Sequence, residues 1–260
     1  MRPALKRLLL SASLPLAMVL VAFPSGAQAS APSLCAQATA EQPLNLEAPT
    51  LTPGPEITAA AAIATESTGD YRHRLRSTPL GWARLDRWCV WVEPAASTGP
   101  AALWDGRWHR AVQAALATWA LLVPITVVDD PAQAQIRVER RRPPLQEING
   151  RLRASHGRSL LRLLRVQRHG QWRLEPQVLV LIGPGQAEAA LQATALHELG
   201  HAVGLWGHSD RPGDALAAVP GGSPVLAPSD RDRRTLIWLS QQATRFGRPE
   251  DPLSTPGSRQ

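Results

Sequence analysis

Residues 197–210 read HELGHAVGLWGHSD, and the interpretation of the whole chain depends on this stretch. It begins with H-E-x-x-H, and residues four apart lie on one face of an α-helix, one turn above the other. His197 and His201 can therefore present ring nitrogens to a single metal ion, with Glu198 beside it. A third histidine, His208, follows seven residues later. Three neutral imidazoles with one open position are typical of a catalytic zinc, whereas structural zinc sites close all four positions.

Two glycines would allow the third histidine to reach the same ion. A helix that carries His197 and His201 must stop and turn before His208 can approach them. Gly204 stands where a left-handed C-terminal cap is expected, because glycine adopts positive φ at little cost. Gly207 would loosen the return of the chain just before His208.

The stretch resembles the zinc signature of the metzincin peptidases, H-E-x-x-H-x-x-G-x-x-H, and among them that of the matrixins. The residues that match are His197, Glu198, His201, Gly204 and Ser209, the last being the serine that often follows the third ligand in matrixins. This resemblance implies a zinc cofactor bound by three histidines and a peptide-hydrolysing activity.

The third ligand departs from the matrixin pattern. Three residues rather than two separate Gly204 from His208, which is similar to a lengthened form of bacterial matrixin-like proteins. Gly207 occupies the standard third-ligand place, so His208 must reach back from one position further on. The alternative is that Asp210 or Asp214 supplies the third contact, since some related zinc peptidases use aspartate there.

The methionine that metzincins carry in a turn beneath the zinc has no counterpart here. Met1 and Met18 are the two methionines of the chain, and both lie in the expected leader. Leu216 is the expected equivalent, since an apolar side chain can still form the floor of the site. The single tyrosine, Tyr71, lies far upstream, so the Met-turn tyrosine of astacin-like and serralysin-like enzymes is absent, which favours the matrixin comparison.

Hydrophobic patterns predict the elements of the domain. Strands are expected at residues 87–93, 124–128, 134–138, 160–166 and 177–182. Apolar residues at helical spacing predict a helix over 105–122 with Asp105 as its cap, and an alanine-rich helix over 186–203 carries the zinc motif. Ser229 and Asp230 are expected to begin a final helix.

The resemblance implies a particular α/β (α+β) architecture for residues 79–247. This is a metzincin-like catalytic domain, with a twisted mixed sheet of about five strands, an active-site helix, a backing helix and a C-terminal helix. The resemblance also places the strand before the active-site helix at the sheet edge, antiparallel to substrate, where unpaired backbone groups bind an extended peptide. The expected substrate-binding residues are Val178, Leu179, Val180, Leu181 and Ile182.

The flanking segments predict an exported protein. Residues 1–29 resemble a signal peptide, with a positive start, an apolar run at 8–23 and a small-x-small cleavage site, Ala27-Gln28-Ala29. The run is short for a membrane anchor, which needs about 20 residues, so no transmembrane span is expected after leader removal. The expected location is the periplasm, the cell envelope or the extracellular space. Residues 30–78 are expected to form a Pro- and Ala-rich pro-segment or linker, and residues 248–260 a flexible tail.

The two cysteines have two interpretations. In an exported chain, a disulfide between Cys35 and Cys89 is the default expectation. The alternative is a cysteine switch, in which the Cys35 thiolate of a pro-segment caps the zinc. The sequence around Cys35 does not resemble the matrixin switch sequence.

Positive charge is concentrated in one part of the chain. The formal net charge is +7, and residues 137–173 hold eleven arginines against Glu139 and Glu147. A solvated protein face explains such a run, and a cationic rim that attracts an acidic polypeptide is the functional alternative. Nucleic acid is not an expected partner, because the chain is expected to be exported and no binding motif is present. A monomer is expected.

These features together favour an exported zinc-dependent endopeptidase. A zinc-activated water would attack the peptide carbonyl, and Glu198 would act as the general base. The alternative is a zinc-binding, envelope-associated module that is catalytically inactive, which the lengthened motif and the missing methionine motivate.

Overall fold

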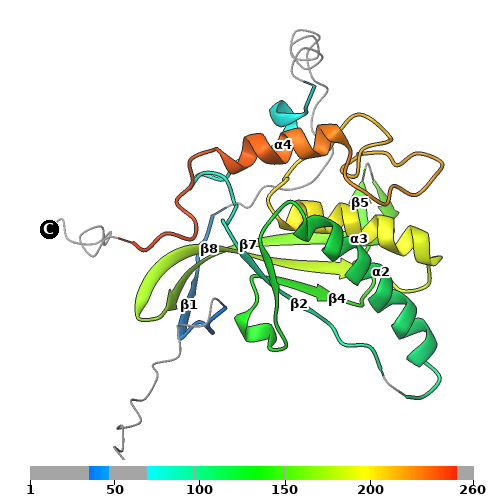
Figure 1. The fold of residues 1–260 in the computed structure, drawn as a ribbon, viewed down its shortest axis with the longest axis horizontal. Helices are drawn as coiled ribbons and strands as arrows, with labels where there is room; N and C mark the ends of the chain where they lie inside the picture. The colour runs from blue at the N-terminus through cyan, green and yellow to red at the C-terminus, as the bar shows by residue number, and fades with distance from the viewer. Residues whose placement is uncertain (1–34, 47–68, 97, 149, 251–260) are drawn as a thin grey trace, which may run out of the picture. The chain divides into compact units, whose positions relative to one another are not determined.

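A mixed β-sheet forms the centre of the domain, and helices pack around it (Figure 1). The computed structural model describes residues 35–46, 69–96, 98–148 and 150–250, all of which belong to one unit, Pro32–Gln260. The predicted signal peptide at 1–29 lies outside the described residues, and so does most of the predicted tail, residues 251–260.

The sheet has six strands in the order β1-β7-β8-β4-β2-β3. The strands are β1 (Ala40–Pro43), β2 (Trp88–Val92), β3 (Ile125–Val127), β4 (Ile136–Glu139), β7 (Gly157–Arg168) and β8 (Gln171–Ile182). β3, β2, β4 and β8 are parallel, β7 is antiparallel to β8, and β1 is antiparallel to β7. β5 (Gln146–Ile148) and β6 (Arg151–Arg153) form a separate two-stranded sheet. The mixed α+β class predicted from the sequence is confirmed, with one strand more than expected.

Three α-helices accompany the sheet. They are α2 (Ala102–Ala120), α3 (Glu188–Ala202) and α4 (Asp230–Ser240), and two 3-10 turns are η1 (Arg72–Arg74) and η2 (Pro131–Gln133). α4 begins as predicted, because Ser229 and Asp232 form a reciprocal capping box. Among the described residues, no helix combines the length and the apolar character that crossing a membrane requires.

Two tryptophans of α2 connect this helix to α3 and to the end of β8. Trp119 is fully buried, and its indole N–H donates to the Leu196 carbonyl oxygen at 2.9 Å. Trp108, which precedes Trp119 on the same face of the helix, is also fully buried. Its indole N–H donates to the Ile182 carbonyl oxygen at 3.1 Å. Buried indoles combine a large apolar surface with one N–H that needs an acceptor. The predicted apolar stripe of this helix therefore connects it to both the end of β8 and the middle of α3.

Asp105 does not cap α2, contrary to the prediction. The helix begins three residues earlier, at Ala102, and its N-cap Ala101 makes no side-chain capping bond. Asp105 is buried, accepts a hydrogen bond from Ala96 N at 3.3 Å and pairs with Arg140 at 3.2 Å. The partner of Asp105 is therefore Arg140, which is distant in the sequence, and not the N-terminus of the helix.

β8 is not an edge strand, and the expectation for its last residues is wrong. Residues 178–181 pair with β4 on one side, and residues 171–182 pair with β7 on the other. Val178, Leu179, Val180, Leu181 and Ile182 therefore have no free edge to offer a peptide. The edge lies on β7, because β1 covers only residues 164–167 of that strand.

Parts of the segment expected to be a linker belong to the domain. β1 extends the sheet, and Cys35 and Cys89 form a disulfide that fastens the start of this segment to β2. Tyr71 is fully buried, and its hydroxyl donates to Asp232 at 2.7 Å. The alternative of a Cys35 switch requires a free thiol, and neither of the two described cysteines has one.

Candidate metal centre

Helix α3 presents two motif histidines from successive turns. His197 and His201 lie four residues apart, so their rings project from one face of the helix. Gly204 has a φ of +117°, and Leu205 N donates to Gly200 O at 3.1 Å. The predicted glycine turn at Gly204 is confirmed, and it ends the helix so that the chain can return.

The returning loop brings the third histidine to the first two. The ring centroid of His208 lies 4.8 Å from that of His201 and 5.3 Å from that of His197. One ring nitrogen of each histidine lies within 4.8 Å of the other two. In the described part of the chain, this trio is the group of side chains that could hold a metal ion.

Gly207 lies where the N-terminal segment crosses this loop. A Cβ atom at position 207 would lie 2.3 Å from the Arg74 carbonyl oxygen, which is far inside van der Waals contact. Beside it, Arg76 N donates to Trp206 O at 2.8 Å. The glycine therefore permits a close backbone crossing, which is a more specific role than the loosening expected from the sequence.

The tautomers of the two helical histidines leave a lone pair on each Nε2 atom. His197 Nδ1 lies 2.8 Å from the Ala215 carbonyl oxygen, and His201 Nδ1 lies 2.7 Å from the Leu205 carbonyl oxygen. A carbonyl oxygen only accepts, so each Nδ1 carries a proton, and in the neutral form of each ring Nε2 is unprotonated. The two Nε2 atoms are 3.1 Å apart. Two lone pairs at this separation repel each other unless a cation or a proton lies between them.

Burial keeps two of the histidines neutral. Burial lowers the pKa of His201 well below its usual value, and the neighbouring His197 and His208 lower it further. Burial, His197 and Arg76 lower the pKa of His208 to about 4. Metal ligands must be unprotonated, so at neutral pH both rings are ready to bind a metal.

The donor set fits zinc. Two nitrogens bound to one tetrahedral zinc at about 2.0–2.1 Å are about 3.4 Å apart, close to the 3.1 Å between the Nε2 atoms of His197 and His201. Carbonyl oxygens behind the Nδ1 atoms are the usual partners that orient metal-bound histidines. The trio includes no fourth ligand from the described residues, and three protein ligands are the number that catalytic zinc sites use.

Glu198 is a buried carboxylate next to the trio. Its residue is 7% exposed, and Ser159 donates to its Oε2 at 2.8 Å. Burial raises the pKa of Glu198, while electrostatic interactions with His197 and Arg158 and the Ser159 hydrogen bond oppose this rise. Gly157 provides the space for the Glu198 side chain, because a Cβ atom at position 157 would lie 2.7 Å from Glu198 Cγ. A carboxylate with a raised pKa is a better base than an ordinary one.

Leu216, the residue expected in place of the missing methionine, packs against helix α3. It is fully buried, and a Cβ atom at Gly200 would lie 2.7 Å from Leu216 Cδ2. Its carbonyl oxygen accepts from Ser209 N at 2.7 Å. The residue before it, Ala215, provides the carbonyl that orients His197. The segment 215–216 therefore packs against α3 and makes hydrogen bonds to His197 and to Ser209, at the two ends of the histidine motif.

Asp210 and Asp214 are engaged elsewhere. Arg231, a buried arginine of α4, pairs with Asp214 at 2.8 Å and with Asp210 at 3.0 Å. Ser209 also donates a short hydrogen bond to Asp214. The trio is formed by His208 and not by either aspartate, so the geometry favours the histidine over the aspartate alternative.

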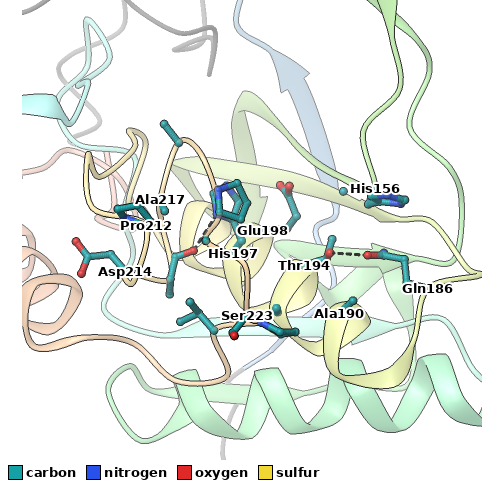
Figure 2. A pocket seen from close by; sticks show the side chains of 18 of the residues that line it. His156, Gln186, Ala190, Thr194, His197, Glu198, Pro212, Asp214, Ala217 and Ser223 are labelled. Atoms are coloured by element: carbon teal, nitrogen blue, oxygen red, sulfur yellow. Dashed lines mark hydrogen bonds between the residues drawn. The ribbon is translucent and has the colours of Figure 1, made fainter.

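A cavity of about 430 Å³ opens beside Glu198 and His197. Figure 2 shows both side chains in its wall, with Asp214 and Pro212 on one side of them and His156, Gln186 and Thr194 on the other. The wall also includes the small and apolar residues Ala190, Ala193, Ala217, Ala218, Pro220 and Val225. The cavity therefore combines a carboxylate and one ring of the histidine trio with a mostly apolar recess.

Sequence reasoning missed three features of this site. Ser159 holds Glu198, Gly157 makes room for it, and Arg231 fixes the loop after His208. No local motif marks them, although the alternation of β7 places Gly157 and Ser159 on the same face. His156 is exposed and also lines the cavity.

No protein-family model matches this chain, and no curated protein matches it either.

Proposed function

We propose that the protein is an exported zinc-dependent endopeptidase of the metzincin type, with a matrixin-like catalytic domain. The observation that carries the proposal is the convergence of three imidazoles beside a buried carboxylate at the wall of a cavity. The mixed sheet and the positions of α2, α3 and α4 are consistent with that architecture. The ligands would be His197, His201 and His208.

A zinc ion held by these three rings would act as a Lewis acid and would lower the pKa of water, which makes water a stronger nucleophile at neutral pH. Glu198 accepts the proton of the attacking water and later donates it to the departing amine. Ser159 fixes the carboxylate for both transfers through its bond to Oε2. The carbonyl oxygens of Ala215 and Leu205 accept from Nδ1 of His197 and His201, respectively. These bonds orient the two rings so that their Nε2 atoms lie near each other.

The proposed substrate is a polypeptide, bound in extended form along β7. Residues 157–162 of this strand have no strand partner on their outer side in the described part of the chain. An extended peptide can add to such an edge through backbone hydrogen bonds. The same strand begins at Gly157, which lines the cavity next to Glu198. A peptide on this edge would therefore run towards the proposed catalytic residue.

Charge around this edge favours acidic polypeptides. The exposed arginines on β7 and on the segment that precedes it are Arg141, Arg142, Arg151, Arg153 and Arg162. Arg141 pairs with Glu139 at 3.0 Å, and the other four form no ion pair with a described carboxylate. Positive potential of this kind raises the local concentration of anionic partners and speeds their association. We expect a monomer acting outside the cytoplasm.

The decisive experiment compares the wild-type chain with Glu198→Gln in a quenched-peptide library, with and without a chelator. The expected result is cleavage by the zinc-loaded wild type, loss of cleavage with the chelator, and a loss of at least about 100-fold in Glu198→Gln. Zinc content of the variant should remain at one ion per chain. Zinc binding by the wild type without any cleavage would instead favour an inactive zinc-binding module.

A further inference from the structure

A second cavity, of about 240 Å³, lies beside the turn that joins β7 to β8. It is formed by residues from the start of the described chain, from the segment before β2, from the β7–β8 hairpin and from the segment after α4 (Figure 1). It shares no lining residue with the cavity at the candidate metal centre. Its chemistry is therefore independent of the proposed peptidase activity.

Arginine dominates the wall of this cavity. Arg87, Arg168, Arg173 and Arg248 line it, against the carboxylates Asp86 and Glu175, so the formal charge is 4 − 2 = +2. Arg87, Arg173 and Arg248 form no ion pair with a described carboxylate.

Both carboxylates of the wall already have partners. Glu175 is 3% exposed and accepts two hydrogen bonds from Arg168 Nε, at 2.9 and 3.0 Å. Gln135 donates to it at 3.3 Å. The side chain of Asp86 is 95% exposed and pairs with Arg84 at 2.8 Å. Neither carboxylate is therefore free to neutralise the remaining arginines.

Buried guanidinium nitrogens in this wall have no acceptor. Arg168 is 5% exposed, and its Nε and Nη1 atoms donate to Glu175 and to the Ala36 carbonyl oxygen. Its Nη2 atom, and the Nε atom of Arg173, are buried without a hydrogen-bond acceptor among the described residues. A buried charged donor without an acceptor costs about 1–3 kcal/mol or more. Such groups in a native site call for an unseen acceptor.

We propose that this cavity binds a phosphate dianion, either free or as a phosphate monoester. A dianion matches the excess charge of the wall, and guanidinium groups bind phosphate oxygens in a bidentate geometry. The carboxylates are already paired with arginines, so the wall offers no set of oxygens for a metal cation. A bound phosphate would connect the N-terminal segment, the β7–β8 hairpin and the segment after α4, and would stabilise the fold by mass action.

Calorimetric titration of the full chain with inorganic phosphate tests this proposal. The chain is kept metal-free with a chelator, so that phosphate cannot bind at the histidine trio. The titration is made at about pH 8, where a phosphate group is dianionic, and at constant ionic strength against sodium chloride. The expected result is one phosphate per chain, absent for chloride, with a rise in the melting temperature.

Arg173→Gln and Arg87→Gln should each weaken phosphate binding by about tenfold or more. Arg162→Gln is the matched control, because Arg162 is an exposed arginine of β7 outside the cavity wall, and its affinity should equal that of the wild type. Arg168 is left intact because it pairs with buried Glu175, and circular dichroism checks that each variant is folded.

A parallel titration with glycerol 3-phosphate separates the two sources of the anion. Binding of both ligands assigns the cavity to monoesters, and binding of inorganic phosphate alone assigns it to the free anion. The proposal is overturned if phosphate gives no more heat than chloride, or if Arg173→Gln and Arg87→Gln both bind phosphate as the wild type does.

Discussion

The hydroxyl of Ser159 shares its single proton between two acceptor atoms of Glu198, the backbone oxygen at 2.9 Å and the carboxylate Oε2 at 2.8 Å. This pairing fastens the start of β7 to helix α3 at the residue proposed as the base. It also lowers the pKa of Glu198 against the larger opposing effect of burial. Ser159 is therefore a positioning residue, which acts through Glu198 and not on the substrate.

Ser159→Ala should reduce the rate of peptide hydrolysis by about tenfold, as expected for loss of one hydrogen bond to a charged group, worth about 1.5–3 kcal/mol. Without the hydroxyl, the pKa of Glu198 rises further, so the acidic limb of the pH–kcat profile should move to higher pH. Thr118→Ala is the control, because Thr118 also donates to a backbone oxygen, at 2.9 Å, but on the exposed side of α2. A lower rate with an unchanged acidic limb would mean that Ser159 serves structure alone.

His208→Ala should abolish tight zinc binding, while Asp210→Ala should change zinc affinity by less than about threefold. The histidine is the third member of the trio, whereas Asp210 pairs with Arg231 and Arg74 and is nearly half exposed at its side chain. An exposed ion pair contributes about 0–1 kcal/mol. Competition with a chromophoric chelator measures both affinities. Loss of zinc in Asp210→Ala alone would reassign the third ligand.

The metal-free chain should lose stability as the pH falls from about 6.5 towards 4. Folding lowers the pKa of His208 from 6.5 to about 4 and lowers that of His201 well below its usual value, so the unfolded chain binds more protons in this window. Stability is then fully present above the unfolded pKa and is lost as the pH falls through the folded one.

The lowered pKa of His208 alone corresponds to a loss of about 3 kcal/mol in the free energy of unfolding over this pH range. Urea unfolding of the metal-free protein at about pH 7.5 and pH 4.5 measures it, and His208→Ala should show a smaller pH effect than the wild type. An equal pH effect in the two proteins would assign the lost stability to other groups.

The zinc motif and most elements could be predicted from the sequence, because their signals are local. Four-residue spacing places His197 and His201 on one face, and the capping residue Ser229 stands beside its own helix. The same holds for the strands at 160–166 and 177–182, which the structure extends into a long hairpin. Local patterns of this kind survive because tertiary packing reinforces them.

The position of β8 could not be predicted, because pairing is a non-local property. The apolar run at 177–182 fits an edge strand or a central strand equally well, and the neighbours β4 and β7 decide between them. The same limit hid β1, since residues 40–43 carry no strand signal of their own and three of the four are exposed. Ser159 and Arg231 were missed because their partners are 39 and 17 residues away.

Gly207 lies against a backbone segment far away in the sequence, and this contact gives the last prediction. Gly207→Ala should destabilise the chain by more than about 2 kcal/mol, in the range of overpacking in a rigid site. The new Cβ would meet the Arg74 backbone at 2.3 Å, and a backbone cannot rotate away as a side chain can. The displaced loop carries His208, so zinc affinity should fall together with stability.

Gly213→Ala is the matched control for this change. Gly213 lies in the same loop after His208, and a Cβ there would meet no atom within 4 Å, so stability should stay within about 0.5 kcal/mol of the wild type. Thermal melts with and without zinc separate the two effects of Gly207→Ala. If that variant melts and binds zinc as the wild type does, the crossing of the 69–76 segment does not explain why a glycine stands where the matrixin pattern has its third ligand.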